Sequence, residues 1–314
     1  MPIHLSTILP TVSPNILPMN NDSLALLLAL GATLSFASAS MIFAIYSKKI
    51  SVIWMNCFKA VTAFVALAVT VPFLTGWHHA ELRSIVGLLL SGWIGLNLGD
   101  LFLLSAFTRI GAARTLILFG FQPLMVGVGA YFLFGQKIPP ERLIAVVFLI
   151  ACLFTFSLEK YRENKSWEFT GLFHALAGVA LDTCGILITR GAFSSSPEIS
   201  PLEGHFYRCA GAVVGFAVLA YFRPFDFRKN FQLQLPKAKF VLIGASLAGT
   251  YLSLALYLSA VKIGQLASIS SIAITGPIFA TTLEHVIHRK APSRYLLIAF
   301  FFFAIGFFIL LRTA

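Results

Sequence analysis

The chain has 314 residues, of which 58% are hydrophobic and only 11% are charged, and its mean hydropathy is +0.87. Soluble domains carry roughly 25% charged residues, so this composition excludes soluble enzymes and nucleic-acid-binding proteins and indicates lipid as the solvent. The 23 Lys and Arg against 12 Asp and Glu give a net charge of +11, which is typical of membrane proteins because their cytoplasmic loops retain basic residues.

Residues 1 to 22 are predicted to form a disordered tail. The first eighteen contain four prolines and no Lys or Arg, so they fit neither a spanning helix nor a secretory signal peptide. Met19 directly precedes a run of helix-capping residue types, 20 to 23, and is therefore an alternative natural start.

Ten apolar stretches follow, each near the roughly 20 residues that a helix needs to cross a bilayer. The predicted spans are residues 24 to 46, 52 to 74, 84 to 107, 112 to 134, 141 to 158, 169 to 190, 201 to 222, 239 to 260, 265 to 287 and 294 to 311. The longest connections, 159 to 168 and 223 to 239, are charged and leave no room for a soluble domain. The sequence therefore predicts an all-α integral membrane protein with ten transmembrane helices.

The two halves of the chain are similar in sequence. A shift of 149 residues places His205-Phe206-Tyr207-Arg208 on Asn56-Cys57-Phe58-Lys59, so a cation closes the same motif in spans two and seven. A shift of 153 places Lys262-Ile263-Gly264 on Arg109-Ile110-Gly111. Internal repeats of this kind are common in transporters.

Each half holds five predicted spans, and an odd number gives the two halves opposite orientations in the membrane. The prediction is therefore two inverted five-helix repeats, residues 23 to 158 and 169 to 312, joined by a charged linker at 159 to 168. Such repeats allow outward-open and inward-open states of similar energy around a site near the midplane.

Several of these motifs together resemble a known family. The run 105 to 113, Pro123 and the run 134 to 139 resemble the repeat signature of EamA-type members of the drug/metabolite transporter superfamily. The second copy is carried by the run 258 to 264, Pro277 and the run 289 to 290. The resemblance covers residues of roughly 24 to 312 and implies a ten-helix metabolite transporter.

Lys59 and Arg208 match the basic position of that family's second and seventh helices, although the second-helix residue is often Arg. The acidic residue often found after the fourth and ninth helices is Gln136 in one copy and Lys290 in the other. No role is therefore carried over to those acidic positions.

Four charged residues fall deep inside predicted spans, where an ionised side chain costs at least about 2.5 to 3.5 kcal/mol unless it faces a cavity or a partner. Lys59 and Asp100 share a depth of roughly 10 Å from one membrane face, and Asp182 and Arg208 share a depth near the other. We predict two ion pairs, Lys59 with Asp100 and Asp182 with Arg208.

These pairs have two interpretations. In the first, each pair only neutralises its own burial cost. In the second, an acid such as Asp182 or Asp100 alternates between its cation and a proton, and Arg208 can also grip a substrate carboxylate or phosphate. Both interpretations stay open from the sequence.

Uncharged polar residues and prolines complete the candidate site. Substrate-binding side chains are expected at Asn97, Gln122, Tyr251, Tyr257 and Thr275. The matched prolines Pro123 and Pro277 predict a pair of helix kinks beside that site, because proline frees a carbonyl within a helix.

The sequence holds no recognisable cofactor or metal motif. The four cysteines lie in apolar stretches without metal spacing, and His285 and His288 lie beside basic residues at a predicted helix end. We expect no catalytic residue, no metal and no cofactor.

The sequence thus predicts a secondary transporter of small organic metabolites, such as amino acids or related compounds, that works by alternating access as an exporter or with proton linkage. Alternatives are multidrug efflux, sugar-phosphate or nucleotide exchange and, in a different class, an integral-membrane enzyme acting on lipids. The expected partners are a small-molecule substrate, the lipid bilayer and protons, without nucleic acid, and the protein is expected as a monomer or homodimer.

The expected location is the bacterial inner membrane. The distribution of Lys and Arg favours cytoplasmic loops after odd-numbered spans, whereas the resemblance implies cytoplasmic termini, so the orientation stays open.

Overall fold

The computed structural model describes residues 21–134, 141–164, 168–264, 269, 272, 275–288 and 292–312. Every regular element within these residues is helical, as the composition predicts. In chain order the helices are α1 (Asn21–Tyr46), α2 (Val52–Leu74), α3 (Leu82–Gly92), η1 (Trp93–Gly99), α4 (Asp100–Ile110), α5 (Ala112–Phe119), α6 (Gln122–Phe134), α7 (Glu141–Asn164), α8 (Phe169–Ser195), α9 (Pro201–Phe222), α10 (Phe227–Gln232), α11 (Pro236–Ser246), η2 (Leu247–Leu252), α12 (Ser253–Ile263), α14 (Thr275–His288) and α15 (Arg294–Arg312).

Six helical stretches are long and apolar enough to cross a membrane. They are Ser23–Tyr46, Val52–Leu74, Leu82–Ile110, Phe169–Ser195, Pro201–Phe222 and Pro236–Ile263. The other four predicted spans correspond to α5 with α6, to α7, to α14 and to α15, and most of 265–274 lies outside the described residues. The all-helical membrane fold agrees with the prediction, whereas the count of ten spans stays a prediction.

The fourth predicted span is broken, not kinked within a helix. α5 ends at Phe119, and α6 begins at Gln122, so Pro123 lies in the first turn of the new helix. Pro277 is the third described residue of α14, and residues 273 and 274 before that helix lie outside the described residues. The expectation of a kink inside a continuous helix is therefore wrong at Pro123, because proline is tolerated in a first turn, where its missing N–H has no helical partner anyway, and it stays a prediction at Pro277.

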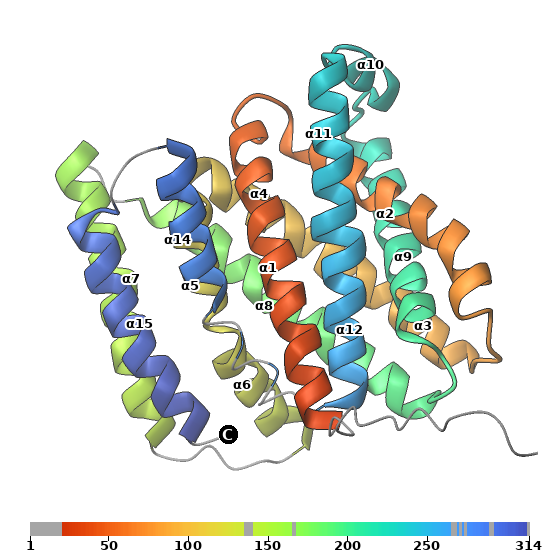
Figure 1. The fold of residues 1–314 in the computed structure, drawn as a ribbon, viewed down its shortest axis with the longest axis horizontal. Helices are drawn as coiled ribbons and strands as arrows, with labels where there is room; N and C mark the ends of the chain where they lie inside the picture. The colour runs from red at the N-terminus through yellow and green to blue at the C-terminus, as the bar shows by residue number, and fades with distance from the viewer. Residues whose placement is uncertain are drawn as a thin grey trace, which may run out of the picture.

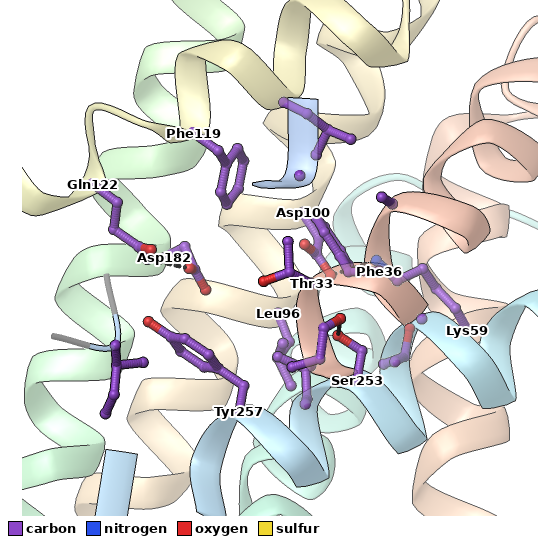
Figure 2. Close-up of a pocket in the computed structure, with 18 residues that line it drawn as sticks. Thr33, Phe36, Lys59, Leu96, Asp100, Phe119, Gln122, Asp182, Ser253 and Tyr257 are labelled. Atoms are coloured by element: carbon purple, nitrogen blue, oxygen red, sulfur yellow. Dashed lines mark hydrogen bonds and ion pairs between the residues drawn. The ribbon is translucent and has the colours of Figure 1, made fainter. Parts of the chain in front are cut away.

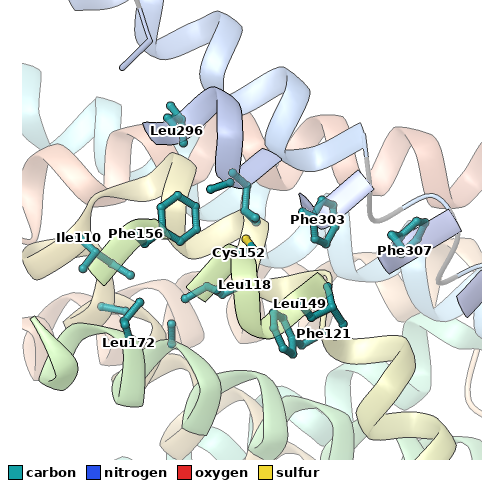
Figure 3. Packing of buried hydrophobic residues seen from close by; sticks show 14 of the residues in the cluster. Ile110, Leu118, Phe121, Leu149, Cys152, Phe156, Leu172, Leu296, Phe303 and Phe307 are labelled. Carbon is teal, nitrogen blue, oxygen red and sulfur yellow. The ribbon is translucent and has the colours of Figure 1, made fainter. Parts of the chain in front are cut away.

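One apolar core joins α7 and α15, which lie side by side at one edge of the molecule (Figure 1). Its buried side chains interdigitate with those of α5 and α8 (Figure 3). The cluster includes Leu118, Leu149, Cys152, Phe156, Leu172, Leu296, Phe303 and Phe307. This packing holds the last helix of the chain against the last helix of the first half.

Glycines bring the helices at the centre of the bundle into backbone contact. A Cβ added at Gly92 would overlap the carbonyl oxygen of Arg208, and one at Gly211 would overlap that of Leu89. On the other side, a Cβ at Gly185 would lie 2.9 Å from the carbonyl oxygen of Ser91. α3 and η1 are therefore clamped between α8 and α9, as small residues allow in membrane helices.

The outer surface of the bundle is apolar. Exposed side chains include Val69 and Phe73 of α2 and Phe301 of α15, with 57%, 85% and 61% of their surface accessible. Such a surface is stable against lipid tails and not against water.

Candidate functional site

A cavity opens between the two halves of the chain and is drawn in Figure 2. With its mouth it has a volume of about 910 Å³. The first half contributes side chains from α1, α2, η1, α4, α5 and α6, and the second half from α8, η2, α12 and α14. Five predicted site residues line it: Lys59, Asp100, Gln122, Asp182 and Tyr257.

Lys59 and Asp100 form the predicted ion pair. The Nζ of Lys59 lies 2.5 Å from Oδ2 of Asp100, and the two side chains are 3% and 16% exposed. The ammonium group also lies 5.3 Å from the ring centroid of Phe43. One cation and one acid of the cavity wall are thus engaged with each other.

Asp182 and Arg208 do not form the second predicted pair. Asp182 Oδ2 instead accepts a hydrogen bond of 2.9 Å from Nε2 of Gln122. Arg208 is fully buried, and none of its three guanidinium nitrogens has a hydrogen-bond partner within the described part of the chain. The predicted Asp182–Arg208 ion pair is therefore wrong for this conformation.

The internal repeat gives the reason for this difference. A shift of 149 residues relates Lys59 to Arg208, but the shift of 154 that relates the two prolines takes Asp100 to Leu254. Arg208 consequently lacks the acid that its counterpart Lys59 has. The prediction paired Asp182 with Arg208 because both lie at the same depth in the membrane. Equal depth does not fix the direction in which each helix presents its side chain.

The segments η1 and η2 are π-helical, and they lie at matched places in the two halves of the chain. The segments start at Trp93 and Leu247, which are 154 residues apart. Asn56 donates from Nδ2 to the carbonyl oxygens of Leu96 and Asn97, at 3.1 and 3.0 Å. π-helical turns frequently occur at functional sites, and both segments border the cavity.

The other predicted polar residues support helix packing. Asn97 donates to the carbonyl oxygen of Ala212, and Thr275 donates to that of Ile272. Tyr251 is partly buried and packs against an apolar cluster on α2 and α9. None of the three is among the residues that line the cavity, and neither is Arg208.

Several lining residues were not predicted. Thr33 and Phe36 come from α1, Phe119 ends α5, and Thr250 and Ser253 lie in and just after η2. Thr33 could have been found from the repeat, because it lies 149 residues before Asp182. The aromatic residues give no such signal in a chain with 31 phenylalanines.

The cysteines and histidines show no metal-binding arrangement in the described segments. Cys57, Cys152, Cys184 and Cys209 are free, and no group of three metal-ligating side chains occurs among the residues described. Gln136 and Lys290, the departures from the family pattern, lie outside the described residues.

At the end of the bundle where α8 and α12 finish, basic side chains bind backbone carbonyls. Arg190 donates from Nη1 to the carbonyl oxygens of Val261, Lys262 and Gly264. Lys262 donates from Nζ to the carbonyl oxygen of Ile199, at 2.7 Å. These bonds satisfy carbonyls at a helix C-terminus and hold the ends of two helices together.

Comparison with known proteins gives a family and a fold. The model of the EamA-like transporter family matches residues 23–158 and again residues 169–312. A solved crystal structure, described only as that of a protein, superposes with a TM-score of 0.63 over 92% of this chain and 96% of that chain, at 16% identity. Comparison with curated proteins gives no match.

At that identity, the solved structure supports a shared fold alone. The two family matches cover most of the chain, and the apolar helices fit a bilayer. The chain therefore belongs to the EamA-like transporter family, within the drug/metabolite transporter superfamily, and is an integral membrane protein of a transporter family and not of an enzyme family.

Proposed function

We propose that this protein is a secondary transporter of small organic metabolites, with amino acids or related compounds as substrates, that exports them across a bacterial inner membrane. The proposal includes ten membrane spans, arranged as two inverted five-helix repeats at residues 23 to 158 and 169 to 312, and alternating access between them.

The observation that carries the proposal is the position of the cavity. Its wall combines Lys59, Asp100 and Gln122 from the first half with Asp182 and Tyr257 from the second. The enclosed volume of the cavity is about 110 Å³, below the roughly 300 to 1,000 Å³ of small-molecule sites, so a metabolite would fit only after the two halves move apart. A rocking motion of one half against the other would change access to a site held by both.

The ion pair offers a means of proton linkage. Asp100 is bound to Lys59 and faces the cavity, so a proton on Asp100 would release the ammonium group and weaken the contact between α2 and α4. We propose that Asp100 alternates between Lys59 and a proton during transport. Proton-linked transport then depends on this acid, whereas exchange of substrate for substrate does not.

Amphipathic drug efflux is the second candidate, because Phe36, Phe119 and Tyr257 give the cavity an aromatic wall. Sugar phosphates fit less well. Lys59 is the only Lys or Arg among the described residues that line the cavity, and Asp100 already occupies it.

The test is transport by the purified protein in proteoliposomes. Labelled amino acids are offered first for counterflow and then under an imposed pH gradient, with Asp100→Asn beside the natural protein. We expect counterflow in both and pH-driven accumulation only in the natural protein. A thermal-shift panel of amino acids, sugar phosphates, nucleosides and cationic drugs identifies the substrate class, since a ligand that binds only the folded state raises its melting temperature. Stabilisation by sugar phosphates alone would contradict the proposed class.

A further inference from the structure

Among the described residues, the cavity is lined by one carboxylate that forms no ion pair. The charged residues of this described lining are Lys59, Asp100 and Asp182. The first two bind each other at 2.5 Å, so their charges cancel locally. Asp182 receives a hydrogen bond of 2.9 Å from the neutral amide of Gln122. The wall of the cavity therefore presents an acceptor group with negative charge and no bonded counterion.

Arg208 also lies beside Asp182, but it is not hydrogen-bonded to this carboxylate. A Cβ built on Gly95 would lie 3.3 Å from Nη2 of Arg208 and 3.5 Å from Oδ1 of Asp182, so the two groups flank the same glycine. They form no ion pair, and Arg208 is fully buried outside the cavity lining. The oxygens of Asp182 thus remain available from the cavity side.

Aromatic groups surround the carboxylate. Figure 2 shows Phe119 and Tyr257 on either side of Asp182, whose Oδ2 accepts the hydrogen bond from Gln122. Phe36 lies with its ring centroid 6.1 Å from that of Phe119 and extends this wall. A carboxylate among aromatic rings suits an organic cation, which gains a charge-assisted hydrogen bond and attraction to the ring faces.

We infer that Asp182 is the acceptor for an ammonium group of the transported compound, so that the substrates are amines or amino acids with an apolar body. An ammonium group carries up to three donors, and Asp182 has acceptor positions left after the bond from Gln122. Gln122 acts as a positioning residue that keeps the carboxylate directed into the cavity. This inference rests on the proposed transport function and specifies its substrate class.

Three ligands with the same apolar body test the inference: phenethylamine, phenylalanine and phenylpropionate. Phenethylamine carries only an ammonium group, phenylalanine carries an ammonium group and a carboxylate, and phenylpropionate carries only a carboxylate. Binding is measured on the full-length protein in detergent by isothermal titration and thermal shift. We expect phenethylamine and phenylalanine to bind and phenylpropionate to bind at least about tenfold more weakly, the effect of one charge-assisted hydrogen bond.

Variants locate the effect. Asp182→Asn should weaken phenethylamine binding at least about tenfold, Asp182→Glu should retain part of it, and Gln122→Leu should weaken it less than Asp182→Asn does. Glu198→Gln, which removes the same charge from an exposed acid outside the cavity, should leave binding unchanged. Size-exclusion profiles check that each variant is folded. If Asp182→Asn does not fold, Asp182→Glu still tests the role of the carboxylate.

Two results would overturn the inference: tight binding of phenylpropionate, or amine binding that survives in Asp182→Asn. Binding of none of the three ligands would also overturn it. These results can be told apart from a failure of the proposed function. The proposed function would still hold if another metabolite stabilised the protein and exchanged in proteoliposomes.

Discussion

Asn56 of α2 and His205 of α9 lie 149 residues apart and make equivalent contacts in the two halves of the protein. Asn56 donates from Nδ2 to the carbonyl oxygen of Leu96 in η1, at 3.1 Å. His205 donates from Nε2 to the carbonyl oxygen of Thr250 in η2, at 2.7 Å. The acceptors are themselves 154 residues apart, and this agreement between side chain and π-helical segment supports the proposed repeat.

Replacing either donor should destabilise the protein by a similar amount. Asn56 and His205 are both fully buried, so Asn56→Leu or His205→Leu leaves a buried carbonyl without its donor, at a cost of about 1 to 3 kcal/mol. The measurement is the apparent melting temperature in detergent. Ser259→Ala is the control, because its hydroxyl donates to the carbonyl oxygen of Ala255 in its own helix. Equal stability of all three variants would show that these contacts are not structural.

The Lys59–Asp100 pair predicts a double-mutant result. Lys59→Met alone leaves a carboxylate in the membrane interior without its cation, and we expect a loss of about 3 to 5 kcal/mol in the free energy of unfolding. Lys59→Met combined with Asp100→Leu removes both charges and should recover most of that loss. Thermal unfolding of the natural protein, the two single variants Lys59→Met and Asp100→Leu, and the double variant measures the coupling, and additive effects would contradict it.

Leu254 stands where the repeat would place an acid for Arg208. Leu254→Asp should supply that partner and stabilise the protein relative to Leu254→Asn by about 1.5 to 3 kcal/mol, the value of a hydrogen bond to a charged group. The Asn variant controls for the loss of the apolar side chain, which packs against the apolar cluster on α2 and α9. A lower melting temperature for Leu254→Asp than for Leu254→Asn would place the Arg208 guanidinium out of reach of position 254.

Gly92 should tolerate no side chain. Gly92→Ala places a methyl group against the carbonyl oxygen of Arg208, so α3 and α9 must separate, with an expected loss of about 1 to 3 kcal/mol or failure to fold. Gly191→Ala is the matched control, because it lies in a helix and a Cβ there meets nothing within 4 Å. Folded yield and melting temperature measure both. Equal behaviour of the two variants would disprove the close approach at Gly92.

The sequence predicted the membrane fold and one of the two ion pairs. Hydropathy and helix length locate spans because both depend on local composition, and they placed Lys59 and Asp100 at one depth. The same argument failed for Asp182 and Arg208, because contact also depends on the rotation of each helix about its axis. The repeat held that information: it pairs Asp100 with Leu254, an apolar residue.

Other features left different signals in the sequence. α10 lies in a loop predicted to be a plain connection, yet Asp226 caps it with a bond of 2.8 Å to the N–H of Lys229, a signal that residue type alone could have indicated. The π-helical segments left no signal, since no residue type distinguishes them from α-helix. Gln122 was predicted as a site residue and lines the cavity, but its hydrogen bond to Asp182, 60 residues away in the chain, depends on how the helices pack.

A π-helical segment changes the number of residues between the two ends of a helix without changing how those ends pack. A π turn holds one residue more than an α turn, so deleting one residue from η1 would let the stretch from Leu82 to Ile110 run as continuous α-helix. Because the π turn absorbs this extra residue locally, the helix after the deletion would keep its orientation relative to α3. Asp100 would still face Lys59, and only the residues of η1 itself, including Leu96 of the cavity wall, would point in new directions. A single-codon deletion is therefore a route by which such a protein could change one part of its cavity lining without rebuilding its bundle.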